Sequence, residues 1–303
     1  MCKGFLSATE CTDSSLRKSF LKIPLDTAKK ITEIRLRSGA PLSVIVGGEI
    51  SFLTDGGFLT KHYSEAITVT REHINSTVKL ITQNSLYSHT DEVENGFISM
   101  PHGNRAGICG VFRQGKFAEP TSVNIRISHE LKGIADRFVK NYSGGSYLLC
   151  GPPASGKTTL LRDFLRGLSN GENGHFYKIS LIDTRHEIAA CFGGTPQNDV
   201  GFNTDVISGR DKALGAEAAL RSMSPDILAF DEIGTESELT ALSNSVNCGT
   251  YIITTAHIGS VDELTKRNVT RRLICSVVDR VIFLPSVAAK PIEINVKNGE
   301  LCL

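Results

Sequence analysis

The sequence predicts an α/β fold in which a domain with a mostly parallel sheet follows a smaller α+β domain. The chain has 303 residues, a length that suits about two domains of about 150 residues each. Its first part shows alternating apolar and polar residues with glycine-rich turns, a pattern typical of antiparallel strands. From residue 147 onward, short apolar runs alternate with segments of helical periodicity. That alternation is typical of a parallel sheet.

Residues 1–128 are expected to form the α+β domain. In chain order, the patterns predict a helix, two strands that meet at a Gly-Gly turn, a second helix and a series of short strands broken by glycines, over residues 15–21, 31–37, 42–46, 71–87 and 97–126. Residues 129–146 follow as a linker that combines a helical pattern with a Ser-Gly-Gly-Ser breaker. The domain boundary is therefore expected within residues 127–146.

Residues 147–303 are expected to form the parallel-sheet domain. Its strands are predicted over residues 147–150, 178–183, 227–230, 250–255 and 280–284. Its helices are predicted over residues 157–168, 213–223 and 236–247. A last strand over residues 292–296 leads to Asn298-Gly299, a pair typical of a tight hairpin turn.

A phosphate-binding loop follows the first strand of this second domain. The loop matches the G-x-x-x-x-G-K-[ST] pattern, and the residues expected to bind the nucleotide are Gly151, Pro152, Pro153, Ala154, Ser155, Gly156, Lys157, Thr158 and Thr159. Glycines let backbone N–H groups turn toward phosphate oxygens, Lys157 supplies positive charge to the β- and γ-phosphates, and Thr158 offers its hydroxyl to Mg²⁺. The motif predicts a P-loop NTPase domain with ATP and Mg²⁺ as cofactors.

An acidic pair follows the strand predicted over residues 227–230. Asp231 and Glu232 come directly after four apolar residues. In a parallel sheet, Asp231 can lie beside Lys157 and Thr158, where it would hold Mg²⁺ together with Thr158. Glu232 can polarise an attacking water, which favours hydrolysis over binding alone. A solvated strand end is the alternative explanation of such a pair.

Two further strand ends carry polar residues on the same expected edge of the sheet. The run from Asp183 to Glu187 follows one buried strand, and His257 follows another. Ligands of open α/β sheets bind at the carboxyl ends of the strands. We therefore expect Glu187 to act in catalysis and His257 to sense the γ-phosphate, although a lone histidine can also be structural or solvated.

The bulk composition excludes several classes of protein. A net charge of +1 with 40% hydrophobic residues excludes a protein that is mainly disordered. It also argues against a protein that binds nucleic acid through a large overall positive charge. No apolar run approaches the ~20 residues of a membrane span, and the N-terminus lacks the apolar core of a secretory signal. The eight cysteines form no C-x-x-C pair, so we expect reduced, mostly buried thiols in a cytosolic protein.

The order of these motifs resembles that of the secretion-type ring ATPases of type II and type IV systems. The shared features are the phosphate loop, the acidic strand end, the tripeptide before the Asp-Glu strand and the final polar strand end, at residues 151–158, 183–187, 224–226 and 254–257. Three segments outside the phosphate-loop domain are similar to a sporulation-associated branch from endospore-forming bacteria, namely Glu33–Arg37, Gly103–Gly110 and Asn124–Ile127. The resemblance covers most of the chain.

This resemblance implies a RecA/AAA-like ATPase that assembles into a homo-oligomeric ring, expected to be a hexamer. It implies a place in the mother-cell cytoplasm, at the base of a membrane channel to the forespore, with membrane proteins of that channel as partners. It also implies an arginine that neutralises transition-state charge, for which the candidates are Arg105, Arg126, Arg210 and Arg221. By this resemblance, residues 183–187 match the acidic box of the family. Their order departs from the family's Asp-Glu-Arg-Ser-Glu, but the outer Asp183 and Glu187 are kept.

Two alternative functions stay open at this point. A nucleic-acid-directed P-loop ATPase would bind in a salt-sensitive way, usually through a basic or stacking module. The sequence lacks such a module, so nucleic acid is not the expected partner. A nucleotide-binding switch would bind ATP with negligible turnover. An ABC-type ATPase would need a Leu-Ser-Gly-Gly-Gln-like signature before Asp231, and a small-molecule kinase would not need Glu232.

Overall fold

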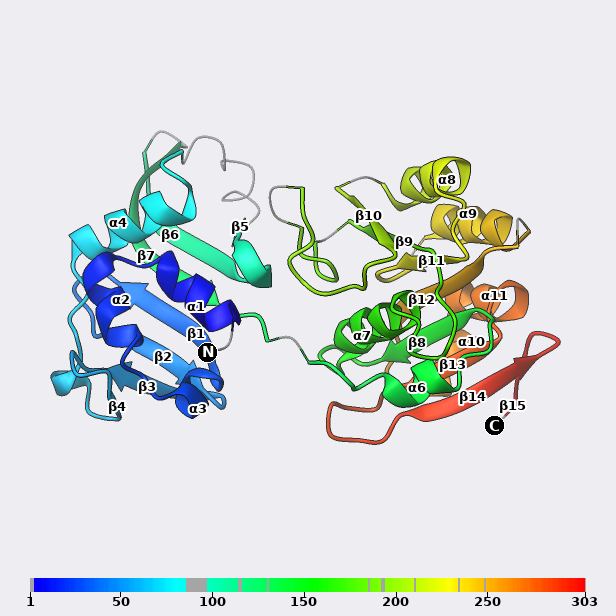
Figure 1. Cartoon of the computed structure of the whole chain (residues 1–303), viewed down its shortest axis with the longest axis horizontal. Helices are drawn as coiled ribbons and strands as arrows, with labels where there is room; N and C mark the ends of the chain where they lie inside the picture. Colours follow the sequence, from blue (N-terminus) through cyan, green and yellow to red (C-terminus); the bar gives the residue numbers. More distant parts are fainter. Residues whose placement is uncertain are drawn as a thin grey trace. The chain divides into compact units, whose positions relative to one another are not determined.

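The computed structural model describes residues 3–85, 97–113, 116–129, 131–184, 186–191, 194–209, 211–233, 235–247 and 249–302. The chain forms two compact units, Met1–His129 and Glu130–Leu303. Figure 1 labels the helices and strands of each unit. Each unit has its own sheet and its own apolar core.

The first unit is built on an antiparallel sheet in the order β4-β3-β2-β1-β7-β6-β5. Its strands are β1 (Ile31–Arg37), β2 (Ser43–Val46), β3 (Glu49–Leu53), β4 (Leu59–Thr60), β5 (Ile98–Ser99), β6 (Arg105–Arg113) and β7 (Lys116–Arg126). Its helices are α1 (Lys3–Glu10), α2 (Ser14–Phe20), α3 (Leu25–Ala28), α4 (Arg71–Ile81) and the 3₁₀ turns η1 (Tyr63–Glu65) and η3 (Pro101–Gly103). Phe5, Phe20 and Ile74 from three of these helices share one core with Ile34 of β1, so the helices cover one face of the sheet.

The region over residues 97–126 differs from expectation. Instead of a series of short strands, β6 and β7 form one long antiparallel hairpin. The glycines do not end β6, because Gly110 lies at a register shift where a Cβ would come 2.0 Å from the Glu119 carbonyl oxygen. A glycine at such a bulge permits close backbone approach within a continuing strand.

The second unit is built on a sheet in the order β10-β9-β11-β12-β8-β13-β14-β15. The neighbours from β10 to β13 pair in parallel, and the last two strands join as an antiparallel hairpin. The strands are β8 (Tyr147–Gly151), β9 (Ile179–Asp183), β10 (Thr204–Ser208), β11 (Ile227–Phe230), β12 (Tyr251–His257), β13 (Arg280–Phe283), β14 (Ile292–Lys297) and β15 (Glu300–Cys302). The expected parallel sheet is therefore confirmed.

Helices cover both faces of this sheet, which is why its central strands read as continuous apolar runs. They are α6 (Asp136–Lys140), α7 (Lys157–Ser169), α8 (Lys212–Ser222), α9 (Glu236–Asn247), α10 (Glu263–Lys266) and α11 (Asn268–Ser276). Along β8, Leu149 packs with α6 and α7, while Leu148 and Cys150 pack with α8, α9 and α11. Alternate residues of one strand thus enter two different cores.

Two features of this unit were not expected from the sequence. β10 was missed because its five residues include no fully buried side chain, so they lack the apolar run of the other strands. The helical pattern expected in the linker of residues 129–146 is α6, but its Phe138 and Val139 were not expected to be buried with α7 in the second unit's core. From residue 131 onward, the described part of this segment belongs to the second unit.

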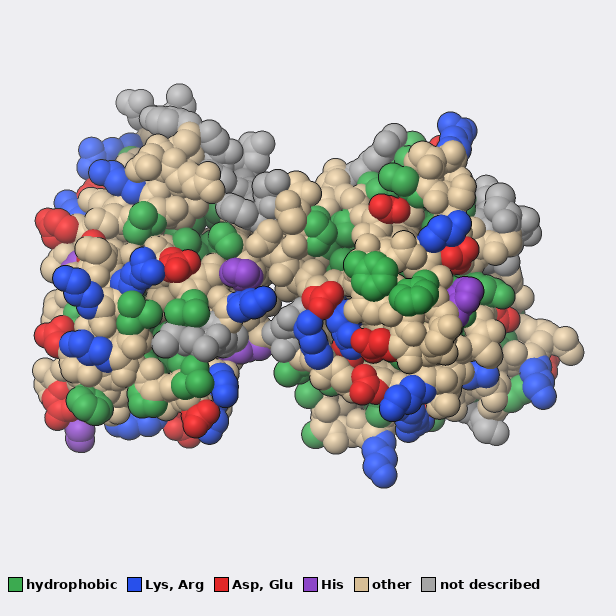
Figure 2. Space-filling view, viewed as in Figure 1, with side chains coloured by type: hydrophobic (Ala, Val, Ile, Leu, Met, Phe, Trp, Pro, Cys, Tyr) green, Lys and Arg blue, Asp and Glu red, His purple; other side chains and the backbone are tan. Residues whose placement is uncertain are grey.

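The surface departs from one expectation. Of the described cysteines, only Cys150 is buried, and Cys109, Cys275 and Cys302 are exposed, so the expectation of mostly buried thiols is wrong. Figure 2 shows cationic and anionic side chains interspersed with apolar ones on the visible face. Among the described helices, none is long and apolar enough to cross a bilayer.

The fold analysis predicts a large stability loss for Phe164→Ala. The fully buried Phe164 ring of α7 lies 5.5 Å from the Tyr147 ring and 5.7 Å from the Tyr142 ring. Its removal should lower the free energy of unfolding by about 3–5 kcal/mol, measured by urea denaturation followed by circular dichroism. Phe202→Ala, at a ring that is 77% exposed, is the control and should cost less than about 1 kcal/mol. Equal losses would contradict the assignment of this core.

Candidate nucleotide site

The phosphate loop joins the end of β8 to the start of α7. Gly156 precedes the helix with φ +93, a left-handed conformation that glycine adopts at little cost. Gly151 is required for another reason, since a Cβ there would lie 2.3 Å from the Leu284 carbonyl oxygen. The first backbone N–H groups of α7 lack partners within the helix, and they carry the positive end of its dipole. This end of α7 is therefore suited to an anion.

Lys157 folds back onto its own loop. Its Nζ donates to the carbonyl oxygens of Gly151 at 3.0 Å and Pro152 at 2.8 Å. Burial lowers the pKa of the Lys157 ammonium, although the nearby Glu232 opposes that shift. The Ser155 Oγ is buried and has no hydrogen-bond partner within the part of the chain that the structure describes. A polar buried hydroxyl without a partner suits a ligand with acceptor oxygens, such as a phosphate.

A cavity of about 720 Å³ lies beside this loop. It is lined by the loop from Ala154 to Thr159 and by further polar side chains, among them Glu187, Asp231, Glu232 and His257. The first three loop residues, Gly151 to Pro153, do not line it. Leu131, Ile134 and Val287 contribute apolar walls, and all three are exposed. The cavity thus combines a cationic loop, three carboxylates and an apolar wall.

The sheet register explains why the acidic pair lies near the phosphate loop. β12 pairs in parallel with β8 on one side and β11 on the other, so all three strands end at the same edge. Asp231 follows β11 and is buried, and its Oδ1 accepts from the Thr255 hydroxyl at 3.3 Å. Burial raises the pKa of the Asp231 carboxyl, and the charges of Glu187 and Asp183 raise it further.

Glu232 adopts an unusual backbone conformation beside Asp231. Its φ is +37, a left-handed value that is rare for a side chain of this size. Its N–H donates to the Thr255 Oγ1 at 3.0 Å, and its Oε2 lies 3.6 Å from the His257 Nε2. Such strain persists only where surrounding contacts enforce it. Here Thr255 and His257 of β12 are two of those contacts.

Asp183 and Glu187 have separate positions although both belong to the acidic box. Asp183 is fully buried, and its carboxylate accepts from the backbone N–H groups of Glu187 at 2.9 Å, Ile188 at 3.1 Å and Ala189 at 2.8 Å. It therefore holds the loop that follows β9. Glu187, by contrast, lines the cavity. Arg185 lies outside the described residues.

Two cations at the site carry no motif and were missed by the sequence reasoning. Lys212, at the start of α8, donates to the Glu232 carbonyl oxygen and lies 3.4 Å from the Glu238 Oε1. Arg162, on α7, donates to carbonyl oxygens of the loop that carries Glu187. Both contacts join residues distant in the sequence, so no local sequence pattern predicts them.

The candidate arginines lie at several places in the fold. Arg126 on β7 is exposed, and its Nε lies 3.8 Å from the Glu33 Oε1. Arg105 on β6 is its partner in the strand register, and the Arg105 guanidinium lies over the Phe97 ring at 4.6 Å. Both belong to the first unit. Arg221 on α8 is exposed and pairs with Glu217, away from the cavity lining. Arg210 lies outside the described residues.

Solved structures with a similar fold are motors and ATPases. The pilus retraction motor PilT with bound ADP aligns with a TM-score of 0.57 at 17% identity, over 89% of this chain and 79% of that chain. The ATPase DotB of Legionella pneumophila aligns with a TM-score of 0.53 at 14% identity, over 88% of this chain and 76% of that chain. At these identities the likeness shows the fold, which is that of the P-loop secretion ATPases.

The sequence comparisons are more specific. The stage III sporulation protein AA of Bacillus subtilis (strain 168) is 31% identical over 273 residues, which cover 87% of this chain and 85% of that protein. The family model described as sporulation stage III, protein AA matches residues 8–299. The match therefore includes both units and every residue that lines the cavity. On this basis the chain belongs to the sporulation stage III protein AA family.

Proposed function

We propose that this protein is an ATP-hydrolysing motor of a sporulation-associated secretion or channel complex between mother cell and forespore. One observation carries the proposal: a single cavity joins the phosphate loop to the carboxylates Glu187, Asp231 and Glu232. Binding alone would need the loop, whereas hydrolysis also needs a group that polarises water. The family membership supports the link to sporulation.

The phosphate loop and Asp231 would bind MgATP. Lys157 would exchange its present contacts with two loop carbonyls for the β- and γ-phosphate oxygens, and the Ser155 hydroxyl and the N–H groups of α7 would add hydrogen bonds. Thr158 and Asp231 both line the cavity and offer hard oxygen ligands of the kind that Mg²⁺ prefers. Bound Mg²⁺ would supply positive charge to the phosphate oxygens.

Three further side chains would act on the reaction. Glu232 is the group we assign to the attacking water, because its carboxylate lines the cavity directly after the Mg²⁺-binding Asp231. His257, 3.6 Å from that carboxylate, would sense the γ-phosphate and orient Glu232. Glu187 would hold the water network on the other side of Asp231.

The proposed motor acts as a homo-oligomeric ring, expected to be a hexamer. An arginine would then neutralise the charge that develops on the transferred phosphoryl group. The candidates are Arg105 and Arg126 of the first unit and Arg210 and Arg221 of the second. The partners would be membrane proteins of the channel. The proposed place of action is the mother-cell cytoplasm, peripheral to the membrane through those partners.

We expect Glu232→Gln to abolish turnover while ATP still binds. Loss of the group that polarises water should lower kcat by about 10²–10⁴-fold, whereas the phosphate loop is left intact. Phosphate release, measured as a function of protein concentration, gives the turnover, and a fluorescent ATP analogue gives the affinity. Glu300→Gln, at an exposed carboxylate of β15, is the control and should behave as wild type.

Three outcomes would contradict the motor assignment. Turnover that is independent of protein concentration in a demonstrated monomer would exclude a ring. Turnover that requires DNA or RNA would favour a nucleic-acid-directed ATPase. Tight ATP binding without turnover under all conditions would favour a nucleotide-binding switch.

Asp231→Asn should raise the stability of the nucleotide-free protein and lower its turnover. A carboxyl with a raised folded pKa stabilises the fold only while protonated, so its ionised form at neutral pH costs stability. The substitution should raise the thermal unfolding midpoint of the nucleotide-free protein at neutral pH. This gain should vanish in acid, below the ordinary carboxyl pKa. Mg²⁺-dependent turnover should fall by about 100-fold or more, and an unchanged or lower midpoint at neutral pH would contradict the prediction.

Arg126→Ala should lower kcat by about 10³-fold if Arg126 neutralises the transition state. Mixing this variant with Lys157→Ala should restore part of the turnover if the arginine serves a neighbouring subunit, because the mixed ring contains intact pairs. Arg71→Ala, at another exposed arginine of the first unit, is the control. Turnover of Arg126→Ala equal to that of the control would remove Arg126 from the site.

A further inference from the structure

We propose that Arg162 is a positioning residue that fixes the Glu187 loop to the helix of the phosphate loop. The inference rests on the proposed function, because it assigns a purpose to a contact beside the proposed catalytic Glu187. Arg162 lies on α7, whose first residue is Lys157. Its Nε donates to the Ile188 carbonyl oxygen and its Nη2 to the Glu187 carbonyl oxygen, each at 2.7 Å.

The loop that carries Glu187 is held from two sides. The Asp183 carboxylate accepts hydrogen bonds from the backbone N–H groups of residues 187, 188 and 189. Arg162 donates to the carbonyl oxygens of residues 187 and 188. The Asn198 Nδ2 adds a bond to the Ile188 carbonyl oxygen at 2.8 Å. Asp183 ties the loop to β9, and Arg162 ties the same loop to α7.

The two main-chain contacts of Arg162 suit a positioning role. Arg162 donates to main-chain carbonyls of the loop, and the Glu187 side chain lines the cavity. A guanidinium presents its donors in a rigid fork, so two bonds to consecutive carbonyls set both the distance and the orientation of the loop. A nucleotide that engages the start of α7 would thereby meet Glu187 at a fixed place.

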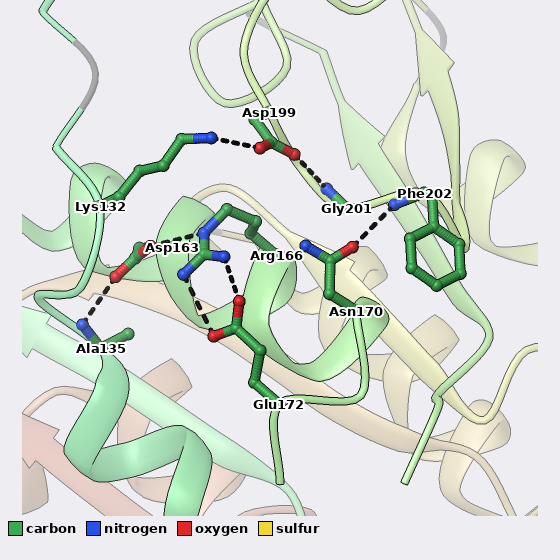
Figure 3. A network of polar contacts seen from close by, with 9 residues as sticks. All are labelled: Lys132, Ala135, Asp163, Arg166, Asn170, Glu172, Asp199, Gly201 and Phe202. Carbon is green, nitrogen blue, oxygen red and sulfur yellow. Dashed lines mark hydrogen bonds and ion pairs between the residues drawn. The ribbon is translucent and has the colours of Figure 1, made fainter. Parts of the chain in front are cut away.

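Arg166, one helical turn further along α7, provides an internal contrast. Figure 3 shows its guanidinium directed to Asp163 and Glu172. Its Nε donates to the Asp163 Oδ1 at 2.8 Å, and Asp163 in turn accepts from the Ala135 N–H at 2.8 Å. None of these atoms belongs to the cavity lining. Arg166 thus joins elements of the core, whereas Arg162 joins α7 to a loop of the site.

The test begins with Arg162→Gln and Arg162→Lys. Because small displacements of a catalytic group are costly, kcat for Arg162→Gln should fall on the order of 10-fold to 100-fold, while ATP affinity stays within about threefold of wild type. The kcat of Arg162→Lys should lie between those of wild type and Arg162→Gln, since an ammonium lacks the planar fork of donors. Arg166→Gln, the control, should lower the thermal unfolding midpoint and leave kcat at low temperature near the wild-type value.

A double-mutant cycle with Glu187→Gln separates positioning from general stabilisation. If Arg162 acts through Glu187, adding Arg162→Gln to Glu187→Gln should lower kcat by less than about threefold, because coupled residues are not additive. A full 10-fold to 100-fold further loss, or a fall in unfolding midpoint as large as that of Arg166→Gln, would overturn the proposal.

The four proteins of this cycle are wild type, Arg162→Gln, Glu187→Gln and the double variant. They also distinguish a failure of this inference from a failure of the proposed function. If wild type binds ATP without turnover, the motor assignment fails, and the cycle is then scored on the Mg²⁺ dependence of ATP affinity. Coupling between Arg162 and Glu187 in that affinity would keep the positioning role, and its absence would overturn it. Hydrogen exchange at the amides of residues 187–189 should rise in Arg162→Gln and stay at the wild-type level in Arg166→Gln.

Discussion

β12 lies between β8 and β11 and hydrogen-bonds to both in the same direction. Because parallel strands end at one edge, Gly151 at the end of β8, Asp231 after β11 and His257 at the end of β12 lie at the same edge of the sheet. β9 extends the same edge from the far side of β11 and brings the Glu187 loop. The cavity follows from this pairing. Helices pack on both faces of the sheet and bury its central strands in two apolar cores.

The edge gathers more negative charge than the phosphate loop can balance by itself. Burial raises the pKa of the Asp231 carboxyl, and the nearby charges of Glu187 and Asp183 raise it further. Hydrogen bonds with backbone groups offset part of the unfavourable free energy of placing these carboxylates close together. The Asp183 carboxylate accepts from three backbone N–H groups, and Lys212 donates to the Glu232 carbonyl oxygen.

The first unit presents a different kind of surface. Its helices cover one face of the antiparallel sheet, so side chains on the other face are not part of the core. The register places Glu33 opposite Arg126 and Arg126 opposite Arg105, which aligns three charged residues in one row across β1, β7 and β6. The strand register produces the row, because directly paired residues of neighbouring strands lie on the same face of the sheet.

The sequence by itself determined the parts of this protein that depend on neighbouring residues. The phosphate loop, the acidic pair at Asp231 and the strand-helix alternation are local, because each rests on a few consecutive residues or on a short period. Only the tertiary structure decided which residues hold that site in place. Asp183 binds backbone amides, Arg162 reaches the Glu187 loop, and β10 lies at the sheet edge. These outcomes depend on contacts between segments far apart in the chain, and no periodicity encodes such contacts.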